Sequence, residues 1–194
     1  MSALFASLAL LLTSPSEQYL LYIIDCDDCP IRYAIAIAPY KAEFLGRILN
    51  DPTSSSYRIC RTYCVLGHAK IDHKLFLPAA LRDVAHDNSN IRLSATWFIG
   101  VAGSGSETKP LMKLLFDSDA DVVSAAMHAL RKIGDDRTIV ALNIWLRYNP
   151  ELQNIPANKS KLQIRQSMIM VRDGIQTRLD AAKKAPPIEP TPKK

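Results

Sequence analysis

The sequence predicts an all-α protein built as an α-solenoid, a stack of about four to five helical hairpins in which each hairpin packs on the next. The first observation behind this prediction is an internal repeat, because an offset of 31 residues aligns residues 91–115 with residues 122–146. The second is that apolar and small residues recur in both segments at the spacing i, i+3, i+4 and i+7, which is typical of one face of an α-helix. A fixed period carried by helical segments indicates a repeat architecture.

The first helix of each of these two repeats carries the clearest apolar stripe. Its members are Ile91, Ser94, Ala95, Phe98, Ile99 and Ala102 in one repeat and Val122, Ala125, Ala126, Ala129, Leu130 and Ile133 in the other. Gly103 and Gly134 follow these helices, at a position where a helix C-terminus favours a residue that tolerates positive φ. A second helix then follows in each repeat, with Leu111, Leu114 and Leu115 aligned with Leu142, Trp145 and Leu146.

Weaker copies of the pattern lie on both sides, as expected near the ends of a stack. An offset of 34 places four residues of the segment 57–81 on the stripe, namely Tyr57, Cys60, Cys64 and Val65. A helix in residues 31–49 begins at Ile31 and is ended by Pro39. The last stripe, in residues 164–180, comprises Ile164, Ser167, Met168, Val171 and Ile175. The repeat domain is therefore predicted to cover residues 17–182.

Short motifs recur between and within these repeats. Acidic turns occur at Asp25-Cys-Asp-Asp, His86-Asp87-Asn88 and Asp117-Ser-Asp-Ala-Asp121, and a Gly-Asp pair occurs at Gly134-Asp135. An arginine follows an apolar residue at Arg32, Arg58, Arg92 and Arg165. These motifs resemble the HEAT-like repeat family, in particular the short form named after phycobilisome (PBS) bilin lyases.

The resemblance implies a ladder of ion pairs along the stack. In such a ladder the arginines Arg32, Arg58, Arg92 and Arg165 would reach turn carboxylates of a neighbouring repeat, among them Asp87, Asp117 and Asp121. Val123 departs from the motif, because the equivalent position carries arginine in the other repeats, so the ladder is expected to be interrupted there. The resemblance concerns architecture and implies little about function.

Residues 1–16 are a candidate signal peptide. Ala3 to Leu12 is an uncharged run of apolar or small residues, and Ser14-Pro15-Ser16 fits a small-x-small cleavage site, with Glu17 as the first mature residue. Export to a bacterial periplasm or out of the cell is therefore favoured, with a cytoplasmic location as the alternative. The segment has no Lys or Arg, and this argues against a signal peptide. The other interpretation is a first helix that is apolar all round because it is buried. No other run is long enough to cross a bilayer, so no transmembrane span is expected in the mature chain.

The positive charge of the chain is concentrated at its end. The formal net charge is +5, but residues 159–194 hold nine Lys and Arg against three Asp and Glu. A domain that reads DNA or RNA should carry a basic stripe on its folded surface. We therefore predict no nucleic-acid binding through the folded domain. Residues 183–194, rich in Pro and Lys, are predicted to form a disordered tail.

The four cysteines fall in two pairs, Cys26-x-x-Cys29 and Cys60-x-x-x-Cys64. Three interpretations stay open at this point: inert thiols, disulfides if the protein is exported, or a zinc site of four thiolates. A catalytic redox role for the first pair is disfavoured, because the three aspartates around it should raise the thiol pKa.

No motif of enzymatic chemistry is present, so we predict no catalytic residue, no metal and no cofactor. None of the four histidines is followed by glutamate, and the His-Glu pairs of metal-dependent HEAT-repeat hydroxylases are thus missing. The prediction is a non-catalytic scaffold that mediates protein–protein interaction or complex assembly. The alternative is an enzyme or lyase subunit, either bilin-lyase-like or a nucleic-acid-binding HEAT-like enzyme. Trp97 and its counterpart His128 lie off the apolar stripe and form a candidate partner surface, unless neighbouring repeats bury them.

Overall fold

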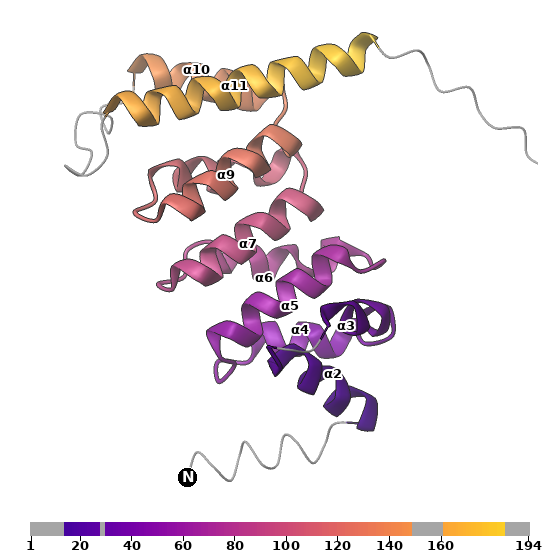
Figure 1. Ribbon diagram of the computed structural model, residues 1–194. Coiled ribbons are helices and arrows are strands. Elements are labelled where there is room, and N and C mark those ends of the chain that lie inside the picture. The colour runs from indigo at the N-terminus through magenta and orange to yellow at the C-terminus, as the bar shows by residue number, and fades with distance from the viewer. Residues whose placement is uncertain (1–13, 28–29, 149–160, 185–194) are drawn as a thin grey trace, which may run out of the picture. The chain divides into compact units, whose positions relative to one another are not determined.

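The computed structural model describes residues 14–27, 30–148 and 161–184. These residues form ten α-helices and four short 3-10 helices, and contain no β-strand (Figure 1). The prediction of an all-α protein is confirmed, and the helices pack mostly against neighbours in the chain. The chain divides into two compact units, one ending at Gly103 and the other beginning at Ser104, and each is described by itself.

The first unit contains six of the α-helices. They are α2 (Pro15–Asp25), α3 (Ile31–Ile37), α4 (Ala42–Asn50), α5 (Ser56–His68), α6 (Leu77–Asp83) and α7 (Ser89–Ala102), with 3-10 helices η1 (Ala38–Tyr40) and η2 (His73–Phe76). The helices α5 and α7 lie side by side and form the centre of this unit (Figure 1). There the fully buried rings of Tyr63 and Phe98 pack with centroids 5.5 Å apart.

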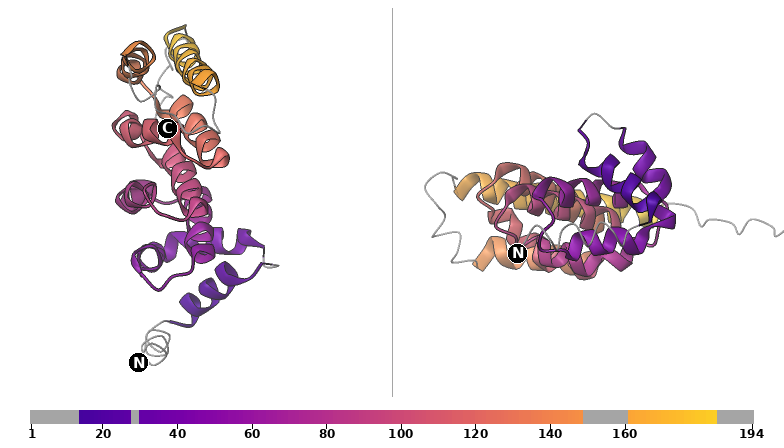
Figure 2. Two further views of the ribbon diagram at one scale, coloured as in Figure 1. Left: turned by 90° about the vertical axis from the view of Figure 1, so that its left-hand side faces the viewer. Right: turned by 90° about the horizontal axis from the view of Figure 1, so that it is seen from below.

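The second unit contains the other four α-helices. They are α8 (Thr108–Lys113), α9 (Ala120–Ile133), α10 (Asp136–Tyr148) and α11 (Lys161–Lys184), with η3 (Gly105–Glu107) and η4 (Leu114–Phe116). The long helix α11 packs against both α9 and α10, as the views of Figures 1 and 2 agree. Its apolar stripe is buried as predicted, through Ile164, Met168, Val171 and Ile175.

The 31-residue offset between the central repeats agrees with the structure. The side chains of Asn88 and Asp119 cap α7 and α9 and are 31 residues apart. In both helices most of the predicted stripe is buried, for example Phe98 in α7 and Leu130 in α9, whereas Ser94, Ala102, Ala125 and Ile133 are half-buried. Trp145, predicted to lie in the core, is only half-buried and packs against Phe116 with ring centroids 5.3 Å apart.

The predicted stripe of α5 is wrong by one residue. Ser55 caps α5 and Asn88 caps α7, so the two helices begin 33 residues apart and not 34. Val65 is buried as predicted, but Tyr57 is 39% exposed and the two cysteines of the helix are only half-buried. The positions that face the core are Ile59, Thr62, Tyr63, Val65 and Leu66. A one-residue shift turns a helix by about 100°, which is enough to move a stripe off the core.

The expectation of positive φ at the helix-ending glycines is also wrong. Gly103 has φ −82° and Gly134 has φ −60°, and no residue in the described part of the chain has positive φ. Gly134 is needed for close approach instead. A Cβ there would lie 2.5 Å from Ile175 Cδ1, so that the absence of a side chain lets α11 pack on the end of α9.

The start of α2 is fixed by a capping box in residues of the candidate cleavage site. The Ser14 hydroxyl accepts a hydrogen bond from the Glu17 backbone N–H at 3.4 Å, and the Glu17 carboxylate accepts one from the Ser14 N–H at 2.7 Å. Pro15 occupies the first helical position, where its missing N–H costs nothing. The spacing Ser-x-x-Glu is itself a sequence signal for a helix start. Residues 1–13 of the candidate signal peptide lie outside the described residues.

A chain of polar contacts leads from the core of the first unit to its surface. The Tyr63 hydroxyl donates to Asp83 Oδ2 at 2.7 Å, and both side chains are buried. Arg82 donates to the other carboxylate oxygen of Asp83 at 2.7 Å and to the Leu49 carbonyl oxygen at 2.7 Å. Burial and the neighbouring carboxylate raise the pKa of Tyr63 far above its usual range, so the phenol stays protonated as the donor.

Removal of this donor is expected to destabilise the chain. Tyr63→Phe leaves a buried carboxylate oxygen without its hydrogen bond, which should lower the free energy of unfolding by about 1–3 kcal/mol. Urea denaturation followed by circular dichroism measures the change. Tyr40→Phe is the matched control, because Tyr40 is 85% exposed. Equal effects of the two substitutions would contradict the role given to the buried bond.

The capping box predicts a pH dependence. The Ser14 backbone N–H, followed by its hydroxyl and Arg47, holds the pKa of Glu17 below its ordinary value of 4.5. A carboxylate whose pKa is lowered by folding stabilises the fold above its unfolded pKa, and that contribution is lost as the pH falls through the folded pKa. Glu17→Gln keeps the capping acceptor without the charge. Thermal unfolding would be measured from about pH 6 to about pH 3, a range that spans the ordinary carboxyl pKa. The melting temperature should therefore fall less on acidification in the variant than in the wild type.

Candidate functional site

An ion pair of the kind expected for the arginine ladder joins α5 to the end of α2. Arg58 of α5 donates two hydrogen bonds to the carboxylate of Asp25 at the end of α2, at 2.6 and 2.8 Å. The two residues are 33 positions apart, so the contact joins neighbouring repeats. Both side chains are about a third exposed, and such pairs contribute at most about 1 kcal/mol.

Arg92 of α7 contacts main-chain atoms of the turn before its own helix. Its guanidinium donates to the backbone carbonyl oxygens of His86 and Asp87, at 2.9 and 2.8 Å, and so closes the turn before its own helix. Asp87 thus contributes its main chain to this contact.

Other members of the predicted ladder make the following contacts. Arg32 lies over the ring of Tyr33, with its guanidinium carbon 5.1 Å from the centroid. In the second unit the Asp117 carboxylate accepts from the Asp119 N–H at 2.9 Å, and Asp121 lies in the first turn of α9. Arg165 is exposed on α11 and belongs to the surface described below.

Three arginines outside the predicted ladder cap helix ends. Arg61 donates to the carbonyl oxygens of Ile23, Ile24 and Cys26 at the C-terminus of α2, at 3.1, 3.2 and 3.1 Å. Arg82 does the same at the end of α4, as given above. Arg178 of α11 donates to the carbonyl oxygens of Arg131 and Gly134 at the end of α9. A helix C-terminus leaves carbonyl groups unpaired and attracts cations. An arginine side chain both donates hydrogen bonds to these carbonyl groups and places a positive charge beside them.

Three of the four cysteines lie among the described residues. Cys60 and Cys64 are free thiols, and burial raises the pKa of both, which disfavours the reactive thiolate. Cys26 is half-buried at the end of α2, while Cys29 lies outside the described residues. Within the described ranges no three side chains of His, Cys, Asp or Glu lie close enough together to hold a metal ion.

Trp97 and His128 both reach the surface of their units. Trp97 is 37% exposed and stacks on His68, with ring centroids 5.1 Å apart. A Cβ on Gly67 would overlap the indole ring, so this glycine allows the ring to lie against α5. His128 is exposed, and its Nδ1 lies 2.9 Å from the Ser124 carbonyl oxygen of the same helix.

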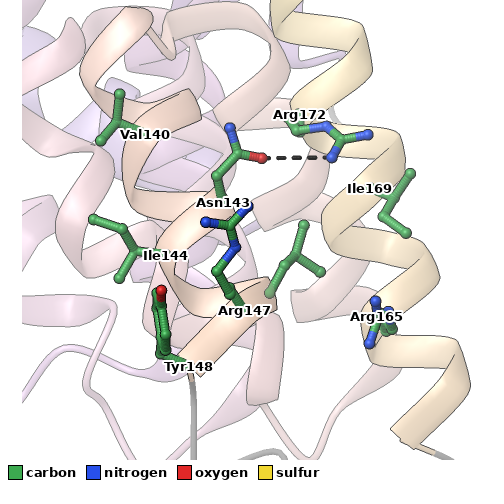
Figure 3. A pocket seen from close by; sticks show the side chains of 9 residues that line it. Val140, Asn143, Ile144, Arg147, Tyr148, Arg165, Ile169 and Arg172 are labelled. Carbon is green, nitrogen blue, oxygen red and sulfur yellow. Dashed lines mark hydrogen bonds between the residues drawn. The ribbon is translucent and has the colours of Figure 1, made fainter.

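A further surface in the second unit combines apolar and basic side chains. Val140, Ile144 and Tyr148 are spaced four residues apart on α10, so they share one face, and they are 57%, 53% and 69% exposed. They line a cavity of about 550 Å³ that is completed by Ile169 and other residues of α11 (Figure 3). We call this the α10–α11 surface.

The charge of the α10–α11 surface is positive. Arg147, Arg165 and Arg172 line the cavity, no carboxylate of a described residue lines it, and Figure 3 shows the arginines on both helices. Arg172 pairs with Asp173 at 2.7 Å and also donates to the Asn143 amide oxygen at 3.4 Å. For Arg147 and Arg165 the described part of the chain supplies no carboxylate within ion-pair distance. The surface can therefore bind anionic groups next to apolar ones.

Sequence reasoning missed this surface although a signal for it existed. The spacing of Val140, Ile144 and Tyr148 is helical, but the predicted stripe of the same helix ran through Leu142, Trp145 and Leu146. An apolar row on the face opposite to the core-facing row indicates exposure.

Comparison with known proteins adds no functional assignment. No protein-family model matches the chain, and no curated protein is significantly similar to it in sequence. None of the described helices combines the length and apolar character needed to cross a membrane. The resemblance to HEAT-like repeats thus stays a prediction from sequence motifs.

The helix-end contacts of Arg61 lead to a prediction. Arg61→Ala removes three hydrogen bonds to the end of α2 and should lower the free energy of unfolding by about 1–3 kcal/mol. Arg32→Ala is the matched control, because it removes the same charge from an exposed side chain. Chemical denaturation of both variants measures the difference. A loss no larger for Arg61 than for Arg32 would show that the carbonyl contacts do not stabilise the unit.

Proposed function

We propose that the chain is a non-catalytic scaffold of HEAT-like helical hairpins, arranged as an α-solenoid, that binds a protein partner through the α10–α11 surface. The observation that carries the proposal is the exposed apolar row of α10 bordered by arginines. A row of large apolar side chains that is more than half exposed is uncommon without a binding role.

The apolar row supplies the kind of contact that dominates protein interfaces. Interface energy is concentrated in a few apolar, aromatic and arginine side chains near the centre of the contact. Tyr148 offers a large ring with a polar end, and Val140 and Ile144 offer rigid branched side chains. A partner helix or strand that covers this row would remove all three from water.

The arginines select the charge of the partner. The guanidinium groups of Arg147 and Arg165 have a planar geometry that matches carboxylates, and no described carboxylate competes for them. A partner segment with apolar side chains flanked by Asp or Glu would therefore fit the surface. The absence of recognisable catalytic motifs in the sequence supports binding over chemistry.

Substitutions on the α10–α11 surface test the proposal. The native chain would be used to capture partners from its own cell fraction, and the dissociation constant of the recovered protein would then be measured. Ile144→Asp should weaken that binding at least about tenfold, because it places a carboxylate in the apolar contact. Arg165→Glu should weaken it by a similar factor and reduce its salt dependence.

The controls match each substitution in chemistry. Tyr40→Asp places a carboxylate at an exposed aromatic residue of the first unit, and Lys109→Glu reverses an exposed charge on α8. Both should leave the affinity unchanged. Salt-sensitive DNA binding that survives deletion of residues 183–194 and is lost in Arg165→Glu would contradict the proposal and favour a nucleic-acid-binding protein.

A further inference from the structure

A second cavity lies in the first unit, between α4 and the segment formed by η2 and α6. It measures about 670 Å³, and most of the residues around it are apolar. Buried Leu49 and Phe76 belong to its lining, and Leu75 is 68% exposed beside them. Gly46 widens it further, because its missing side chain would face Phe76. We call this the α4–α6 groove.

The beginning of α2 lies at one edge of the α4–α6 groove. Arg47 lines the groove and donates to the Glu17 carboxylate at 2.8 Å. Lys41, next to the first residue of α4, donates to the Ser14 hydroxyl at 3.3 Å. These two contacts, over 30 and 27 positions of sequence, hold the N-terminal end of α2 against the helix that forms one wall of the groove.

The chain preceding this point has a matching composition. Thirteen residues precede Ser14, and the run from Ala3 to Leu12 is apolar or small and carries no charge. Such a length spans about 20 Å if helical and about 40 Å if extended, either of which exceeds the width of one helix, about 10–12 Å. The segment can therefore reach across Arg47 into the groove without moving α2.

We propose that the segment Ala3–Leu12 docks in the α4–α6 groove of its own chain and covers the exposed Leu75. An uncharged apolar segment fits this groove better than a charged one, because burying an unpaired charge there would be costly.

The contacts of Ser14 and Glu17 with α4 support retention of the segment in the mature chain. Cleavage before Glu17 would remove Ser14, and with it the capping box of α2 and the bond to Lys41, and loss of a cap destabilises a helix.

Photo-crosslinking in the full-length protein tests the docking. A photoreactive phenylalanine analogue at position 75, in dilute solution, should form a crosslink within one chain that peptide mapping places in residues 1–13. The same analogue at Val140, which is exposed in the other unit, should give no crosslink to that segment. The double variant Leu8→Asp/Leu11→Asp should lose the product, while Ser2→Asp should keep it.

Each alternative has its own result. An N-terminal sequence that starts at Glu17 in the natively produced protein would overturn the proposal and support export. Crosslinks that join two chains would also overturn it, and would assign the groove to a second copy. A crosslink from position 75 to a different protein would also overturn the proposal, and so would the absence of any crosslink. None of these results depends on whether the α10–α11 surface binds a partner.

Discussion

Short helices that end without a left-handed residue leave their last carbonyl groups unpaired. Within each of the two units, side chains from other helices bind these carbonyl groups. No described residue has positive φ, so the usual glycine caps of helix C-termini are absent. Arginines from other helices take their place, with Arg61 at the end of α2, Arg82 at the end of α4 and Arg178 at the end of α9. One guanidinium supplies several donors and a charge that suits the helix dipole. Each cap also joins two helices that are distant in the sequence.

The sequence predicted the core-facing stripes of α7, α9 and α11 more readily than the polar contacts between helices, for a physical reason. A stripe is periodic, so the 31-residue repeat around Ile91 and Val122 could be found by alignment, and the structure buries it. An arginine that caps a distant carbonyl leaves no periodic signal. The contacts of Arg61 are an example. The N-caps Ser55 and Asn88 would have corrected the register of α5, because their side chains mark helix starts directly.

The candidate sites illustrate the same division. Trp97 and His128 were selected because they lie off the stripe, and both reach the surface of their units. The α10–α11 surface required knowledge of which face of α10 is covered by α11, and this depends on a contact between segments that no local pattern encodes. The α4–α6 groove likewise arises where α4 meets η2 and α6. Helical repeats form binding surfaces from adjacent elements, so the residues of such surfaces are scattered in the sequence.

The distribution of the aromatic residues has a practical consequence. The chain has two tryptophans, and each unit contains one of them, Trp97 against His68 and Trp145 against Phe116. Each indole therefore reports on the packing of its own unit through its fluorescence. Proteins with a single remaining tryptophan would thus allow the melting of the two units to be followed separately by optical spectroscopy.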